Sequence, residues 1–166
     1  PSEMCIRDSV GAQSILVGRD AVLRHTAANF GGEVVRNTPR VRYAGSGGDV
    51  ELLGVYYADD GQYIENRLLV DHNHPYCRSN VLYKGALQGD KSSKLPDART
   101  CWVGDVLIRS NASGTETYEA NRNIVLTDGA RADAIPNLEI ETGDIPGAGH
   151  AATVGLSLIH ISERAG

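Results

Sequence analysis

The 166-residue sequence has few of the residues that build aromatic cores, zinc knuckles or membrane spans. It contains one Trp, one Phe and one Met, and its three cysteines form no Cys-x-x-Cys pair. Cysteines this sparse exclude a disulfide scaffold and a self-contained zinc knuckle. No apolar stretch approaches the roughly 18 to 20 residues that a membrane-spanning helix requires. A net charge of −5 also argues against a protein that tracks nucleic-acid phosphates.

Both ends of the chain differ in character from its middle. Met4–Ser9 and Leu156–Ser162 resemble conceptual translations of the two strands of a sequencing-library transposon end. We therefore interpret residues 1–9 and 156–166 as adapter-derived tails, and residues 10–155 as a core fragment truncated at both ends. The N-terminal stretch lacks the apolar segment of a secretory signal, so a cytoplasmic location is expected.

What the sequence does contain is glycine, 19 residues spread between short aliphatic runs. Within residues 10–155 the longest interval free of Gly and Pro is Thr115–Asp128, and a helical apolar period is weak throughout. Runs such as Val50–Tyr57, Arg67–Val70 and Cys101–Ile108 are bounded by turn residues, which is typical of short strands. The sequence therefore predicts an all-β fold.

A partial repeat suggests how the strands are arranged. Tyr63–Arg67 is echoed by Tyr118–Arg122, 55 residues later, and each copy is followed by an aliphatic run that ends in aspartate. A near-constant offset predicts a solenoid with two rungs of roughly 27 residues in each period. Such stacking would place aliphatic side chains inside, glycine at the corners, and an unpaired strand edge at each end.

Few residue patterns point to catalysis. The stretch Gly85–Ser92 departs from a phosphate-binding loop in its spacing, and Asp90 stands where phosphate would lie. Cys77 and Cys101 are isolated from each other and from any companion cysteine. Isolated free cysteines are more often buried apolar groups than nucleophiles.

Three histidines are candidate ligands. His72 and His74 could share a metal from one side of a strand, but Pro75 follows at once, and no third ligand is placed by spacing. We therefore expect two solvated histidines at a corner of the chain. His150 stands in the small-residue stretch Gly147–Thr153, which leaves its ring accessible to a metal or partner, or simply places it in a glycine-rich connection.

Several stretches taken together resemble those of a known protein family. They are Val70–Pro75, Ser79–Gly85, Asn121–Asp128 and Ala134–Ile140, joined by Leu95–Thr100 and Gly147–His150. In this order and spacing they resemble the SufB/SufD family, the scaffold subunits of the SUF system of iron–sulfur cluster assembly. The likeness extends over residues 10–155, and it is closest to the SufD branch of the family.

This resemblance implies a right-handed parallel β-helix that pairs with a SufB-like subunit, and a C-terminal region outside this chain that docks the SufC ATPase. It implies a non-catalytic scaffold that holds iron or an iron–sulfur cluster only transiently, with no cofactor bound tightly to the fragment. His150 matches a family histidine at the SufB–SufD interface and becomes the candidate iron ligand. Ala148 stands where some relatives have cysteine, so imidazole rather than thiolate is expected from this subunit. No nucleic-acid or membrane partner is expected.

Other functions stay open on the residues alone. A β-helix hydrolase or lyase acting on an acidic polysaccharide needs paired carboxylates on one outward sheet. A metal-dependent small-barrel enzyme would use His72 and His74. The sequence also leaves open whether the partner is SufB or a second copy of this chain, and whether iron, heme or flavin is carried.

Overall fold

The computed structural model describes residues 8–90 and 92–156, and this part of the chain contains ten strands and no helix. It therefore has no apolar helix of membrane-spanning length. The strands are β1 (Asp8–Val17), β2 (Val22–Asn29), β3 (Val34–Tyr43), β4 (Asp49–Ala58), β5 (Tyr63–His72), β6 (Arg78–Leu87), β7 (Arg99–Ile108), β8 (Glu116–Val125), β9 (Arg131–Ile140) and β10 (Gly147–Leu156).

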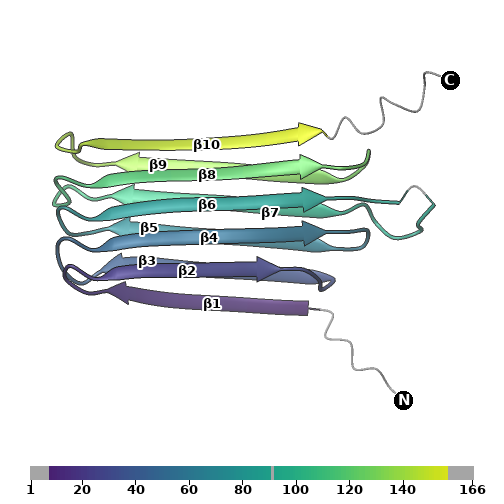
Figure 1. Ribbon diagram of the computed structural model, residues 1–166, viewed down its shortest axis with the longest axis horizontal. Helices are drawn as coiled ribbons and strands as arrows, with labels where there is room; N and C mark the ends of the chain where they lie inside the picture. The colour runs from purple at the N-terminus through teal and green to yellow at the C-terminus, as the bar shows by residue number, and fades with distance from the viewer. Residues whose placement is uncertain (1–7, 91, 157–166) are drawn as a thin grey trace, which may run out of the picture.

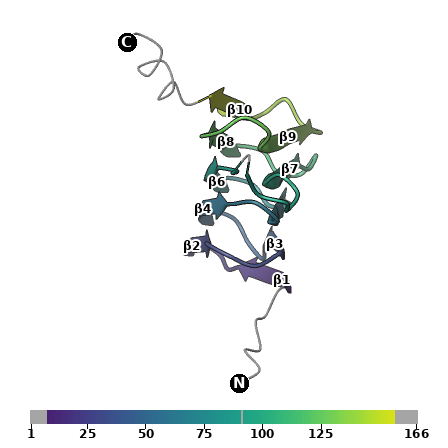
Figure 2. The same ribbon diagram turned by 90° about the vertical axis from the view of Figure 1, so that its right-hand side faces the viewer.

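The strands form two parallel five-stranded sheets that face each other (Figure 2). One sheet has the order β1-β3-β5-β7-β9 and the other the order β2-β4-β6-β8-β10, so each turn carries the chain from one sheet to the other. In Figure 1 the even-numbered strands run left to right on the near side, and the odd-numbered strands return behind them as the chain climbs. The coil is therefore right-handed, and the predicted all-β, right-handed parallel β-helix is confirmed.

The core lies between the two sheets. Alternate residues of each strand point inward, as the two-residue period of a strand requires. Because neighbouring strands pair in register, inward side chains stack in columns from rung to rung. Val41, Val70 and Val106 form one such aliphatic column, and all three are buried.

Two inward glycines make room for tyrosines of the neighbouring rung. Gly54 of β4 pairs with Tyr83 of β6, and Tyr56 of β4 pairs with Gly85 of β6. A Cβ atom on either glycine would overlap the tyrosine ring beside it, and both rings are buried. Some glycines do occupy corners as predicted, such as Gly61 with φ 75°. Gly54 and Gly85 instead fix which side chains fit together between rungs.

The predicted repeat is wrong. Tyr63 begins β5 in the odd-numbered sheet, whereas Tyr118 lies in β8 in the even-numbered sheet. The two copies are three strands apart, which is one and a half rungs, so they do not occupy equivalent positions. The turns also differ in length, from residues 30–33 between β2 and β3 to residues 88–98 between β6 and β7. The solenoid is established by its strand pairing and not by a repeat in its sequence.

The two stretches interpreted as adapter-derived tails lie mostly outside the described residues. Asp8 and Ser9 nevertheless form the start of β1, where they pair with Val34 and Val35 of β3. Leu156 forms the end of β10.

Candidate functional site

His150 lies in β10, the last described strand of the even-numbered sheet (Figure 1). It pairs in register with Glu119 of β8, one rung earlier. Paired residues of parallel strands present their side chains on the same face of the sheet, so both side chains point between the sheets. The last strands of the two sheets, β9 and β10, form what we call the C-terminal end of the solenoid. His150 therefore belongs to a strand and not to a glycine-rich connection.

Glu119 lies directly beneath His150 and is buried. His150 Nδ1 is 4.0 Å from Glu119 Oε1, and the two side chains are 46% and 0% exposed. Within the described part of the chain, neither carboxylate oxygen of Glu119 has a hydrogen-bond partner. Burial raises the pKa of Glu119 to about 8, and the negative charge of Asp105 adds to the shift. The pair thus combines an accessible imidazole with a buried, unsatisfied carboxyl group.

The wall opposite Glu119 is formed by β7. Gly104 leaves the space that the Glu119 carboxyl group fills, since a Cβ atom there would overlap Glu119 Oε2 and the Trp102 ring. Trp102 is fully buried, and its indole N–H also lacks a hydrogen-bond partner among the described residues. A hollow of about 540 Å³ at this end is lined by His150 together with residues of β5, β7 and β9, Asp105 among them.

The C-terminal end does not hold a complete set of metal ligands. The described residues contain no group of three His, Cys, Asp or Glu side chains placed to bind one metal ion. Residues 8–90 and 92–156 therefore do not supply a full coordination sphere for a metal ion held at His150.

The expectation that His72 is a solvated corner residue is wrong. His72 is the last residue of β5 and is fully buried. Its Nε2 shares a 2.9 Å hydrogen bond with Ser79 Oγ, and its ring stacks on Tyr43 with 4.9 Å between the ring centroids. Burial lowers the pKa of His72 to about 4, and nearby Asp71 opposes the shift. The strand β5 extends through His72, and the turn begins only at Asn73, so the side chain of His72 lies in the core. Its lowered pKa keeps the buried ring neutral.

His74 lies in the turn after β5 and is partly buried. The alternative of a metal-dependent small-barrel enzyme that uses His72 and His74 requires a closed barrel. The described strands form two separate sheets, which contradicts a barrel. His72 and His74 also belong to no three-ligand group in the described range.

The two described cysteines differ in their surroundings. Cys77 is fully buried, as expected for an apolar group, whereas Cys101 is only partly covered. Cys101 stands between the inward-facing Thr100 and Trp102, so its side chain points to the outer face of the odd-numbered sheet. Burial raises the pKa of both thiols, which opposes the thiolate form that binds metals.

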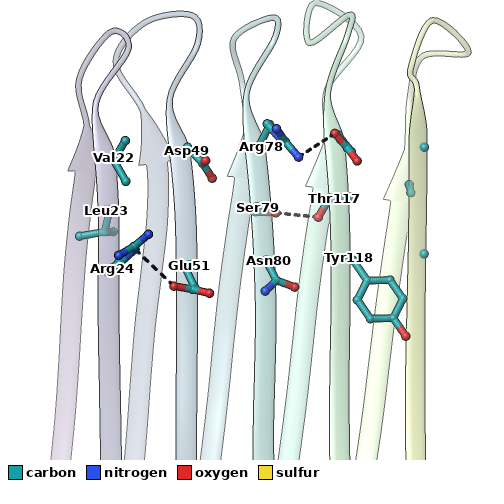
Figure 3. A pocket seen from close by; sticks show the side chains of 14 residues that line it. Val22, Leu23, Arg24, Asp49, Glu51, Arg78, Ser79, Asn80, Thr117 and Tyr118 are labelled. Carbon is teal, nitrogen blue, oxygen red and sulfur yellow. Dashed lines mark hydrogen bonds and ion pairs between the residues drawn. The ribbon is translucent and has the colours of Figure 1, made fainter.

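A hollow of about 740 Å³ runs across the outer face of the even-numbered sheet near its turns (Figure 3). Its charged side chains pair across the rungs: Arg24 lies 3.5 Å from Glu51, and Arg78 lies 3.2 Å from Glu116. Both glutamates are thus committed to ion pairs. A polysaccharide hydrolase needs a pair of carboxyl groups available for proton transfer, and these two glutamates do not form one.

The sequence did not identify Glu119 as a candidate site residue, although it lies within the Tyr118–Arg122 motif. The alternation of β8 places Thr117, Glu119, Asn121 and Asn123 inside and leaves the larger apolar side chains outside. A hydrophobic pattern would predict the opposite face. The available signal was the spacing between Glu119 and His150, which equals one rung, and it becomes visible only once the rung lengths are known.

Comparison with known proteins gives the family. The sequence model described as "SUF system FeS cluster assembly, SufBD core domain" matches residues 9–157. An iron–sulfur cluster assembly SufBD family protein of Mycobacterium tuberculosis is 66% identical over 146 residues, which are 88% of this chain and 37% of that protein. A counterpart in Mycobacterium leprae is 64% identical over the same shares. The iron–sulfur cluster assembly protein SufD of Escherichia coli is 25% identical over 85% of this chain and 31% of its own length. The chain spans 31% to 37% of the length of these relatives, and it belongs to the SufBD family of iron–sulfur cluster assembly proteins.

Proposed function

We propose that this chain is the β-helical core of a SufD-like scaffold subunit. The subunit pairs with a SufB-like partner and holds iron or a nascent iron–sulfur cluster while a separate SufC ATPase hydrolyses ATP. It is not itself a catalyst, and it works in the cytoplasm. Family membership and the likeness to SufD support this function. The observation that carries it is the accessible imidazole of His150 at the C-terminal end of the solenoid.

The C-terminal end also has the character of a pairing surface. The inward-facing side chains of Ile140, Val154 and Leu156 are 45%, 50% and 71% exposed. Within residues 8–90 and 92–156, β9 and β10 each have one edge without a partner strand. Apolar side chains and free strand edges favour the addition of another chain. A SufB-like subunit that covered this end would enclose His150 between the two proteins.

The ligands would then come from both subunits. His150 would supply a neutral nitrogen, and the thiolates would come from the partner, because Cys77 is buried and Cys101 points away from the space between the sheets. Mixed imidazole and thiolate ligand sets have precedent in iron–sulfur proteins. SufC would dock on a C-terminal region of the parent protein that lies outside this chain.

The test is to express the full-length parent with SufB and SufC and to measure iron and acid-labile sulfide per complex. His150→Ala should lower both, while the matched control His74→Ala, a turn histidine away from the C-terminal end, should leave them unchanged. Normal loading in the His150→Ala complex would remove the ligand role.

A further inference from the structure

We propose that Glu119 is a second ligand beside His150, so that this pair takes up a single ferrous ion before a cluster is built. The inference rests on the proposed function, because the pair supplies two ligands and the partner subunit is proposed to supply others. It adds a binding residue and names the species that binds first.

Glu119 differs from the other inward-facing polar residues of β8 in its hydrogen bonding. Its polar neighbours on the same inward face are all paired across the rungs. Thr117 Oγ1 lies 2.6 Å from Ser79 Oγ, Asn121 Nδ2 donates to Tyr56 Oη at 2.9 Å, and Tyr56 Oη donates to Asn123 Oδ1 at 2.6 Å. Glu119 alone in this row has two buried oxygens without a partner. Leaving such a group unpaired is costly, so an unsatisfied carboxyl group at an open end points to a bound cation.

The distance between the two side chains fits one metal ion after a small adjustment. Two ligand atoms that each lie about 2.0–2.2 Å from one ion are about 3.0–3.4 Å apart. His150 Nδ1 and Glu119 Oε1 are 4.0 Å apart. The imidazole is half exposed, whereas the carboxyl group is fully buried in the space between Gly104 and the Trp102 ring. A shift of the imidazole by less than 1 Å therefore brings both atoms into one coordination sphere.

The donor set selects the kind of ion. Carboxylate and imidazole form the ligand set of non-heme ferrous centres, whereas assembled clusters are held mainly by cysteine thiolates. The pair therefore suits a ferrous ion that arrives without sulfide.

The experiment titrates the complex of the full-length parent, SufB and SufC with ferrous iron alone, without oxygen or sulfide. Glu119→Gln keeps the shape of the protonated side chain and should weaken ferrous binding by about tenfold or more. The matched control is Glu116→Gln on the same strand, whose carboxylate pairs with Arg78 on the outer face. It should bind ferrous iron as the wild type does.

The outcomes separate the two proposals. Loss of ferrous binding in both His150→Ala and Glu119→Gln supports the pair. Loss in His150→Ala alone overturns the role of Glu119 and leaves the scaffold function standing, whereas normal binding and loading in both variants contradict both proposals. Iron X-ray absorption of the wild-type complex tests the same point without a variant. Nitrogen and oxygen neighbours are expected, and a shell of sulfur alone would refute the inference.

Discussion

Protonation of His72 should determine part of the acid sensitivity of the fold. The ring is enclosed by Tyr43 and Ser79, and its pKa falls from 6.5 to about 4 when the chain folds. Its Nδ1 has no hydrogen-bond partner in the described region, so a second ring proton would be buried without an acceptor. Between these two pKa values the unfolded chain binds more protons, so stability falls as the pH is lowered. Lowering the pH from 7.5 to 4.5 should cost about 2.5 kcal/mol through this residue.

Urea unfolding of the chain at pH 7.5 and pH 4.5, compared with His72→Gln, isolates this contribution. The other ionisable groups are common to both proteins, including Glu119, whose raised pKa produces the opposite dependence between about pH 4.5 and pH 8. We expect the stability advantage of the wild type over His72→Gln to shrink by about 2.5 kcal/mol at pH 4.5. An advantage that is equal at the two pH values would refute the assignment of His72 as a buried neutral residue.

Three further predictions follow from the packing. Gly54→Ala should lower the unfolding free energy by about 1–3 kcal/mol because the new methyl group meets the Tyr83 ring, and a double-mutant cycle with Tyr83→Ala should show coupling. Asp71→Asn should cost about 1–3 kcal/mol in urea unfolding, because Asp71 accepts hydrogen bonds of 2.6 and 3.0 Å from Arg109. Val154→Asp should abolish copurification of the parent with SufB while changing its melting temperature little, since the side chain is half exposed.

Each of these predictions has a clear contrary result. Additive effects in the Gly54 and Tyr83 cycle would show that the two rungs do not interlock there. An unchanged urea midpoint in Asp71→Asn would show that the ion pair contributes nothing. Normal copurification of Val154→Asp with SufB would place the pairing surface elsewhere.

The strands that sequence reasoning found are those with strong intrinsic strand preference. Val50–Tyr57 and Cys101–Ile108 lie inside β4 and β7, where β-branched and aliphatic residues are dense. The strand β10 was missed because its glycines and alanines have weak strand preference, and pairing with β8 overrides that preference. Local composition predicted the fold class, but it could not predict strands that form only because a neighbour is present.

The candidate site was predicted only in part. The resemblance to a family identified His150, and the structure shows that its ring is accessible. The role of Glu119 could not be predicted, because strand alternation does not say which face is inside when polar residues are buried and Tyr118 is exposed. His72 was expected to be solvated because the sequence does not show where β5 ends. A shift of the strand end by one residue changes this side chain from buried to solvated.

The most direct test of the central claim is nitrogen hyperfine coupling in the complex of the full-length parent, SufB and SufC. The cluster is assembled, reduced by one electron and measured by pulsed electron paramagnetic resonance, with this subunit alone carrying ¹⁵N-labelled histidine. A ¹⁵N coupling should appear in the wild type and in His74→Ala and should vanish in His150→Ala. A cluster without ¹⁵N coupling, or a coupling that survives in His150→Ala, would contradict the assignment of His150 as the ligand that this subunit contributes.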